Sequence, residues 1–329
     1  MLISENAVNM LAAKSYKGIG RKWINDNLAG SPSVERIVQL LGEKVEDVSV
    51  SDFEARKRNV RQKIEALDDA IDGVVGLGDE DFPRIGDGVK GADRPIALFY
   101  KGDIGLIKSP SENVAVIGLL NPTEQIAADE REVVSALVAQ GKCIVSGLAL
   151  GCDSVAHRET LDRGGETVAF LAGPLNEVNP PSNRSLAAGI VEEGGLLVSE
   201  YYEKAHSRNE FLGRYAERDR LQAMFASCVI LAASYSQKDR GCDSGSRFAM
   251  GKAREYGVPR CVIYDKLRDA GDPMYNLTRD EIAVGAAIIT PGSDLKLPCS
   301  EMCQQETFWG GGRLPCTILK MMSCLRKAG

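Results

Sequence analysis

The sequence is poor in aromatic residues and in histidine, and it has no long apolar run. Aromatic residues make up 6% of its 329 residues, and His157 and His206 are its two histidines. The longest apolar runs, such as residues 168–172 and 228–233, have the length of a strand and are too short to cross a bilayer. No basic stretch precedes the apolar residues near the N-terminus, as a signal peptide would require. We therefore expect a cytoplasmic protein with no membrane partner.

Common nucleotide-binding motifs are absent as well. No G-x-G-x-x-G follows the first strand predicted below, and no G-x-x-x-x-G-K-[ST] occurs, so neither ordinary NAD binding nor a P-loop is supported. A P-G-G-x-G-T-x-x-E stretch, typical of enzymes that cleave nucleoside monophosphates, is also missing. We therefore predict no cofactor.

The nine cysteines do not form a metal-binding pattern. Cys143, Cys228 and Cys261 sit inside apolar runs and are expected to be small core residues. The tail cysteines lack C-x-x-C spacing and have no histidine nearby, and they are Cys299, Cys303, Cys316 and Cys324. We expect no metal site.

Charge of one sign does not dominate the chain. With 40 basic and 46 acidic residues, the formal net charge is −6. This balance argues against a protein that coats duplex DNA by bulk electrostatics, but it leaves room for a local basic groove.

The pattern of residues divides the chain into four segments. Residues 1–73 have helix-like spacing of apolar residues, which predicts a small helical domain. Residues 74–112 are rich in Gly, Asp and Pro and contain one apolar run, 96–100, which predicts a connector with a lead-in strand. Residues 113–290 alternate short apolar strands with amphipathic helices, and residues 291–329 form a Cys-containing tail with no clear domain.

Strand-like runs recur about every thirty residues in the third segment, which is the length of a βαβ unit. Several are apolar at nearly every position, as expected of strands covered on both faces. The predicted strands are 114–117, 143–146, 167–171, 196–199, 228–232, 261–264 and 287–290. The sequence therefore predicts an α/β fold with a Rossmann-like, doubly wound, mostly parallel sheet.

The first helix between these strands is predicted to be amphipathic. One side carries the apolar residues Ile126, Val133, Val134, Leu137 and Val138. The other side is expected to carry the polar residues Asp129, Glu130, Arg131 and Gln140.

Ligands of such sheets bind outside the carboxyl ends of the strands, and small polar residues follow four of the predicted strands. Asn121 is the expected N-cap after the first strand, with Pro122 and Glu124 in the first helical turn. Asp153 and Ser182 are the expected caps after the second and third strands. Four helix N-termini would then point at one crevice.

A cluster of helix N-termini is a predicted phosphate-binding site. Each terminus offers unpaired N–H groups and the positive end of a helix dipole. For any single loop, a simple tight turn is the alternative interpretation. The residues expected to contact the ligand are Asn121, Thr123, Ser146, Gly147, Gly151, Asn183, Arg184, Ser244, Gly245, Ser246 and Arg247.

An arginine-rich segment precedes the strand at 228–232. It places arginines close to the aromatic residues Phe211 and Tyr215, an arrangement that suits phosphates with stackable bases. We therefore add Arg214, Arg218 and Arg220 to the predicted nucleic-acid site. A salt-bridged helix surface is the alternative, because acidic residues are interspersed with these arginines.

Catalytic residues are not predicted. Asp153 and His157 lie four residues apart on one predicted helix and could face each other, but no nucleophile accompanies them. We expect His157 to pack against the sheet edge, and we expect a protein that is not an enzyme.

These blocks together resemble the DNA-processing protein A family, also called DprA or Smf, from about Val74 to Thr290. The most specific block is 146–149 with Gly151, Asp153 and 156–158. Further matching blocks are 76–83, 97–103, 180–181, 183–184, 199–201, Arg218 with Arg220, and 244–246. The Gly-Ile-Gly stretch at 18–20 is similar to the family's small SAM-like helical domain.

The resemblance implies a homodimer that binds and protects incoming single-stranded DNA. It also implies help in loading a RecA-type recombinase during natural transformation, without a catalytic step of its own. Leu120 and Leu150 stand where the family usually has basic residues, and Asp219 stands where it usually has Asn. Lost positive charge weakens phosphate binding. A nucleotide-binding sensor that uses the same crevice is therefore the alternative function, and a nucleotide-processing enzyme of the cytokinin-activating type is a third.

Overall fold

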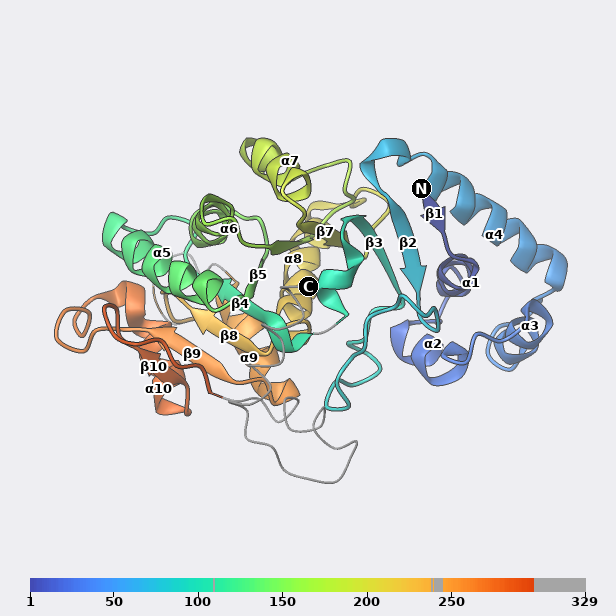
Figure 1. Cartoon of the computed structure of the whole chain (residues 1–329). Coiled ribbons are helices and arrows are strands. Elements are labelled where there is room, and N and C mark those ends of the chain that lie inside the picture. Colours follow the sequence, from blue (N-terminus) through green and yellow to red (C-terminus); the bar gives the residue numbers. More distant parts are fainter. Residues whose placement is uncertain (109, 238, 240–244, 299–329) are drawn as a thin grey trace, which may run out of the picture.

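The computed structural model describes residues 1–108, 110–237, 239 and 245–298. The predictions for Ser244 and for the tail cysteines lie outside the described residues. Within the described part, ten strands form one sheet in the order β1-β2-β3-β7-β6-β5-β4-β8-β9-β10. Helices cover both faces of this sheet (Figure 1). None of the helices in the described residues is both long and apolar enough to span a bilayer.

The central and C-terminal strands run parallel, as predicted. They are β4 (Asn113–Ile117), β5 (Cys143–Ser146), β6 (Thr167–Leu171), β7 (Leu196–Ser199), β8 (Cys228–Leu231), β9 (Arg260–Ile263) and β10 (Ala287–Ile289). The chain builds outward from β4 through β5 and β6 to β7, and then returns to place β8 on the other side of β4. This reversal beside β4 is the switch point of a doubly wound sheet, which confirms the predicted fold class.

The N-terminal third extends the same sheet. β2 (Gly73–Gly76) pairs antiparallel with β3 (Ala97–Gly102), β3 pairs antiparallel with β7, and β1 (Leu2–Ile3) pairs parallel with β2. The sequence predicted a strand close to β3 but neither β1 nor β2. Both strands are short, and β2 begins and ends with glycine. Neither therefore shows the alternation of apolar and polar residues that predicts a strand.

The N-terminal helices are α1 (Glu5–Lys14), α2 (Arg21–Leu28), α3 (Val34–Gly42) and α4 (Val50–Glu65). Most of their apolar side chains are buried, and Met10, Phe53 and Ile64 are fully so. The same cluster continues into Leu148 and Leu171 at the carboxyl ends of β5 and β6. The helical segment therefore shares a core with one face of the sheet.

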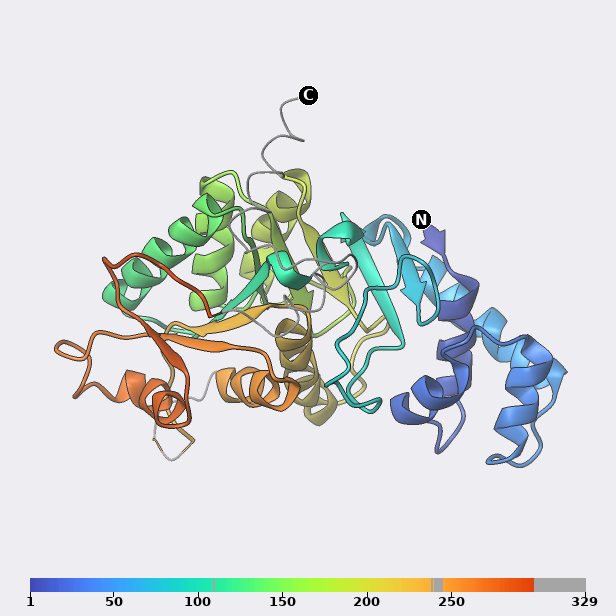
Figure 2. The ribbon, with the colours of Figure 1, turned by 60° about the horizontal axis from the view of Figure 1, so that its bottom comes forward.

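The remaining helices form two layers (Figures 1 and 2). α5 (Glu124–Ala139), α6 (Cys152–Asp162) and α7 (Arg184–Glu192) lie in succession over one face. α8 (Arg208–Met224) and α9 (Ser246–Tyr256) pack along each other on the opposite face, and α10 (Asn276–Ala283) lies beside β9.

Two acidic residues of α5 are buried, which corrects the predicted amphipathic pattern. Asp129 is paired with Arg268, and Glu130 is fully buried beside Cys152. Burial raises the pKa of Glu130 well above its ordinary value, with a smaller opposing effect from its hydrogen bond with Cys152. The physical reason is that α5 packs against α6 as well as the sheet. Its buried surface is therefore wider than a single apolar stripe.

Candidate nucleic-acid interface

The carboxyl ends of β4, β5, β6 and β8 lead into loops that interlock. The backbone N–H of Cys152, at the start of α6, donates to the carbonyl of Leu119 at 2.9 Å. Ser246 Oγ, at the start of α9, donates to the carbonyl of Gly118 at 3.2 Å. A Cβ on Gly151, whose φ is +72°, would lie 2.2 Å from the carbonyl oxygen of Leu119. The predicted glycine loops therefore meet at one edge of the sheet.

The Arg218 guanidinium packs directly against the backbone of Gly147 at this edge of the sheet. A Cβ on Gly147 would lie 1.0 Å from Nη1 of Arg218, so the guanidinium occupies the space that a side chain would need. Nη1 of Arg218 lies 3.4 Å from Asp153 Oδ2, and Nε lies 3.3 Å from Asp219 Oδ1. Arg218 is thus a buried cation between two carboxylates, held against a backbone with no side chain.

Asn183 holds the loop after β5 in place. Its side-chain amide donates to the carbonyls of Leu148 at 2.9 Å and Ala149 at 3.1 Å, and to Ser154 Oγ at 2.9 Å. Asp153 Oδ2 accepts from the Ala149 N–H at 3.1 Å. Leu148 adopts a φ of +57°, a backbone conformation that non-glycine residues rarely take. A strained backbone held by several hydrogen bonds is frequent at binding sites.

Helix capping differs from the prediction at three places. Thr123, rather than Asn121, caps α5 by accepting from the Ile126 N–H at 3.3 Å. Gly151 is the N-cap of α6, and Asp153 lies inside its first turn. Ser182 lies in a 3₁₀ turn, and Asn183 takes the cap position of α7, although its side chain makes no hydrogen bond to the N–H groups of that helix. At α6 and α7 the cap residue lies where neighbouring loops touch, Gly151 against Leu119 and Asn183 against Leu148, which local capping preferences do not encode.

The other predicted site residues fall into two groups. Asn121, Thr123 and Arg184 are exposed on the rim of the edge. Within the described residues, no hydrogen bond or ion pair engages the guanidinium of Arg184. Ser146, Gly245 and Ser246 lie inside the edge, where Ser146 Oγ donates to the Val116 carbonyl at 2.7 Å, and Arg247 follows them in the first turn of α9.

Arg214 and Arg220 point away from this cluster. Arg214 donates to Glu210 and to the Glu203 carbonyl, and its guanidinium lies 4.0 Å from the centre of the Tyr201 ring. Arg220 is 2% exposed and donates to Glu200 at 2.8 Å and to the Asp93 carbonyl at 2.8 Å. The guanidinium groups of both residues are therefore engaged inside the protein.

The docking of the N-terminal helices on α8 is a feature that the sequence did not reveal. Arg21 pairs with Glu217 and lies 3.7 Å from Glu200, the same carboxylate that binds Arg220. These partners are far apart in the chain, so no local pattern links them.

His157 is buried against the sheet, in line with its predicted packing role. Thr167 Oγ1 donates to the Ile144 carbonyl, so His157 Nδ1 donates to Thr167 Oγ1 at 2.7 Å. Burial lowers the pKa of His157 to about 4, with nearby Asp153 raising it and Arg218 lowering it. A neutral, inward-facing imidazole has a structural role.

Solved structures of DNA processing protein A from two bacteria are among those with a similar fold. DNA processing protein A of Streptococcus pneumoniae matches with a TM-score of 0.67 and 24% identity, over 89% of this chain and 97% of that chain. DNA processing protein A of Helicobacter pylori, whose structure describes its single-stranded DNA binding mode, matches with a TM-score of 0.53 and 26% identity. That match covers 67% of this chain and 92% of that chain.

Curated relatives carry the same family names. The DNA processing protein DprA of Streptococcus pneumoniae is 31% identical over 62% of this chain and 66% of its own length. The protein Smf of Escherichia coli is 37% identical over 33% of this chain and 29% of its own length. The matched stretches thus span less than two thirds of these relatives. The family DNA recombination-mediator protein A matches residues 73–295, which is more than half of the chain. The chain therefore belongs to the DNA recombination-mediator protein A family.

Proposed function

We propose that this chain binds single-stranded DNA at the carboxyl edge of its sheet and acts by binding, as a mediator in DNA uptake and recombination. The observation that carries the proposal is the interlocking of four strand-to-helix loops around Gly147 and Arg218. Helix N-termini at such an edge favour phosphate groups. The DNA processing proteins among the relatives, and the single-stranded DNA binding mode described for the Helicobacter pylori protein, support the same ligand.

Two arginines would supply the positive charge of this site. Arg184 is an exposed cation at the start of α7, and Arg218 lies against Gly147. Asp153 and Asp219 offset the charge of Arg218, so Arg184 is expected to make the stronger contribution to the initial phosphate contact. The remaining contacts would come from loop backbone at Gly151 and Gly245.

The test is a titration of labelled oligo-dT at several salt concentrations, run beside free nucleotides. Arg184→Ala should weaken strand binding and reduce the salt slope by about 0.7, the effect of one phosphate contact on a single strand. Arg254→Ala is the matched control, because Arg254 is exposed at the opposite end of α9. Equal affinities for the two variants and the unmodified protein would count against the proposed site.

A nucleotide-binding sensor is the second candidate function. Leu120 and Leu150 are 39% and 46% exposed on the rim, where they offer apolar contact in place of charge. A rim of this kind suits a small ligand with one base better than a long polyanion. Tight binding of a free nucleotide, together with weak binding of oligo-dT, would favour this function.

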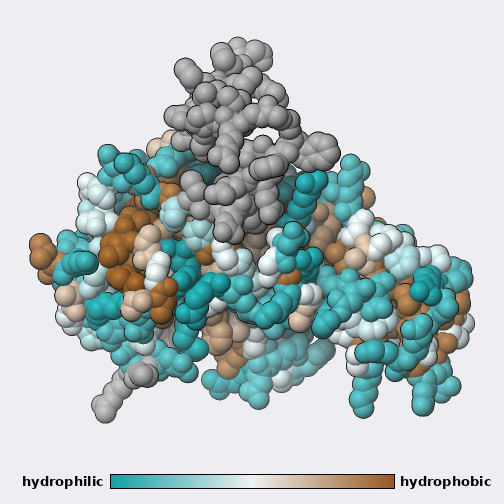
Figure 3. All heavy atoms as spheres, turned by 90° about the horizontal axis from the view of Figure 1, so that it is seen from below, coloured by the Kyte–Doolittle hydropathy of each residue, from teal (hydrophilic) through white to brown (hydrophobic). Residues whose placement is uncertain are grey.

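Homodimer formation and contact with a RecA-type recombinase belong to the same proposal. Figure 3 shows apolar side chains gathered at the end of the molecule that carries β9, β10 and α10. Val284 and Ile288, beside and within β10, are exposed there, and β10 is an edge strand. An exposed apolar edge strand supports pairing with a second copy. Sedimentation that gives a monomer at micromolar concentration would oppose the dimer.

A further inference from the structure

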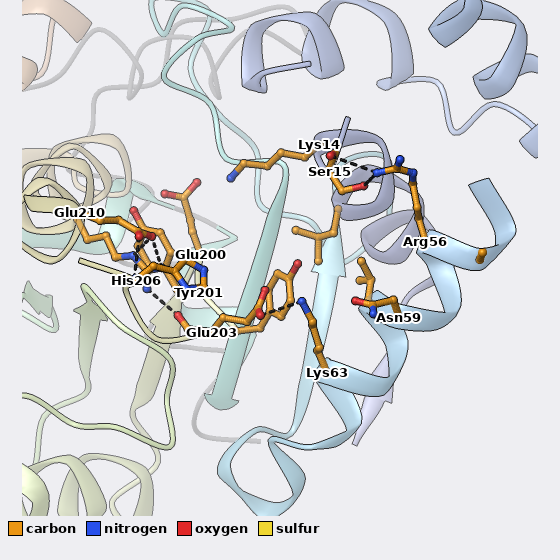
Figure 4. A pocket seen from close by; sticks show the side chains of 15 residues that line it. Lys14, Ser15, Arg56, Asn59, Lys63, Glu200, Tyr201, Glu203, His206 and Glu210 are labelled. Carbon is orange, nitrogen blue, oxygen red and sulfur yellow. Dashed lines mark hydrogen bonds and ion pairs between the residues drawn. The ribbon is translucent and has the colours of Figure 1, made fainter. Parts of the chain in front are cut away.

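A pocket of about 610 Å³ lies outside the candidate interface, between the N-terminal helices and the loop after β7 (Figure 4). Its walls come from α1, α4, residues 200–206 and the first turns of α8. Its volume lies in the range of pockets that hold small molecules, about 300 to 1,000 Å³. A second hollow of about 340 Å³ shares Lys63 and Tyr202 with it and reaches Pro174 and Asn176 on the loop after β6.

Two polar side chains in the pocket wall are unengaged. Within the described residues, neither the Lys14 ammonium nor the Asn59 amide makes a hydrogen bond or an ion pair. Both residues are exposed, and Figure 4 shows Lys14 extending from α1 toward Glu200. Glu200 is bound by Arg220 at 2.7 Å. Burial lowers the pKa of Lys14, while the nearby charge of Glu200 raises it, so a bound anion would further favour the charged ammonium.

The other cations of the pocket are paired. Arg56 pairs with Asp52 at 3.0 Å, and Lys63 pairs with Glu203 at 2.9 Å. Because Lys14 is the one cation of this lining without a partner in the described part, the pocket matches a ligand with one phosphate. Glu200, Glu203 and Glu210 are paired with Arg220, Lys63 and Arg214, so a second phosphate would meet no further unpaired lysine or arginine in the described lining.

The aromatic wall suits a base. Tyr201 and Tyr202 line the pocket and are partly exposed. The Arg214 guanidinium lies 4.0 Å from the Tyr201 ring centre, and the Tyr202 ring centre lies 5.5 Å from that of Phe99. Rings held in this way lose little freedom when a base packs on them. The Asn59 amide offers both a donor and an acceptor to the edge of a base.

We propose that this pocket binds one nucleotide, a base with a single phosphate, and that it takes this nucleotide from the DNA strand held at the sheet edge. The proposal rests on the proposed function. Arg214 lines the pocket four residues before Arg218 on α8, which is about 6 Å along a helix. The second hollow also leads toward the loop after β6. A strand leaving the interface can therefore follow the protein surface into the pocket.

The test compares Lys14→Ala with Lys44→Ala in the full chain. Both variants remove one exposed lysine from the helical segment, but Lys44 lies outside the pocket. Each protein is titrated with oligo-dT of about 4 and about 16 nucleotides, the span of single-strand site sizes, and with thymidine monophosphate. We expect Lys14→Ala to weaken binding of the long strand several-fold and to reduce its salt slope by about 0.7. Binding of the short strand should stay unchanged.

The outcomes separate this proposal from the proposed function. Identical long-strand and monophosphate binding by the two variants would overturn the pocket as a nucleotide site. Monophosphate binding that depends on Lys14, with no effect on the long strand, would support the pocket and overturn its link to the strand. If the unmodified chain binds no strand of either length, the proposed function fails whether or not Lys14 affects the monophosphate.

Discussion

Gly147 is the residue on which the geometry of the candidate interface most depends. Its missing side chain lets the Arg218 guanidinium lie against the loop backbone, where Asp153 and Asp219 hold it. The sequence predicted Gly147 as a place where a ligand approaches the backbone. In the structure, the Arg218 guanidinium occupies that approach. A bound phosphate would therefore meet Arg218 directly at this loop.

Replacing Gly147 with Ala should displace Arg218. The guanidinium is the end of a flexible side chain and can move, but it is buried between Asp153 and Asp219, so we expect destabilisation of about 1 to 3 kcal/mol. Binding of oligo-dT should weaken about tenfold, which corresponds to about 1.4 kcal/mol. Gly213→Ala is the control, because Gly213 lies within α8 with open space at its Cβ position. It should raise stability by about 0.5 to 1 kcal/mol and leave affinity unchanged. If Gly147→Ala binds oligo-dT as tightly as the unmodified protein, Arg218 takes no part in strand binding.

His157 should make stability fall in mild acid. Its pKa is about 4 in the folded protein, while an unfolded chain has the ordinary value of about 6.5. The unfolded state therefore binds more protons between these values, and the stabilisation is present above about pH 6.5 and lost as pH falls toward 4. His157 should account for about 2 kcal/mol of loss between pH 7 and pH 5.

Urea unfolding at the two pH values measures this effect against His157→Gln. The variant should lose about 2 kcal/mol less than the unmodified protein over the same interval. Carboxylates also titrate in acid, but they are common to both proteins and cancel in the comparison. Equal losses would show that His157 is not buried in a neutral form.

The two rim leucines should accept arginine without loss of stability. Leu120 and Leu150 are 39% and 46% exposed, so the longer side chains need not enter the core. A Leu120→Arg, Leu150→Arg double variant should bind oligo-dT more tightly, with a salt slope larger by about 1.4 for two added phosphate contacts. The free energy of unfolding, measured by thermal denaturation, should change by no more than about 0.5 kcal/mol. Lower stability without a gain in affinity would instead support the nucleotide sensor.

At the scale of elements, the strands and glycine loops were predictable and the role of α8 was not. Each predicted strand from 114 to 290 begins and ends within one residue of the observed strand, because buried parallel strands are continuous apolar runs. The arginines of α8 look alike in sequence, yet Arg218 lies at the candidate interface and Arg220 lies among Glu200, Glu217 and Asp93. Long-range partners decide this difference.

Arg220→Ala should destabilise the protein strongly. The change leaves the Glu200 carboxylate, 8% exposed, without its closest cation. Removing one partner of a buried ion pair costs about 3 to 5 kcal/mol. Urea unfolding measures the loss, and Arg208→Ala serves as the control because Arg208 is exposed at the start of α8. A fully stable Arg220→Ala protein with weaker, less salt-dependent DNA binding would instead make Arg220 the phosphate contact predicted from the sequence.

At the scale of the whole molecule, one sheet connects the N-terminal helices to the candidate interface. β1 joins the sheet edge through β2, and the helical core reaches Leu148 in the loop after β5. The sequence divided these parts because their residue patterns differ. It could not reveal the shared core, because the contacts of this core join segments that are far apart in the sequence. The pocket between α1, α4 and the loop after β7 exists only because of this docking.

We expect the carboxyl edge of the sheet to select single-stranded DNA over duplex DNA. The most direct test of this selectivity is an anisotropy titration of the full chain with oligo-dT and with a duplex of equal length at the same salt concentration. We predict tighter binding of the single strand, because a flexible backbone can follow loops at a sheet edge while its bases stay accessible. The net charge of −6 gives no general attraction for duplex DNA. Equal or tighter binding of the duplex would show that the sheet edge does not select single-stranded DNA.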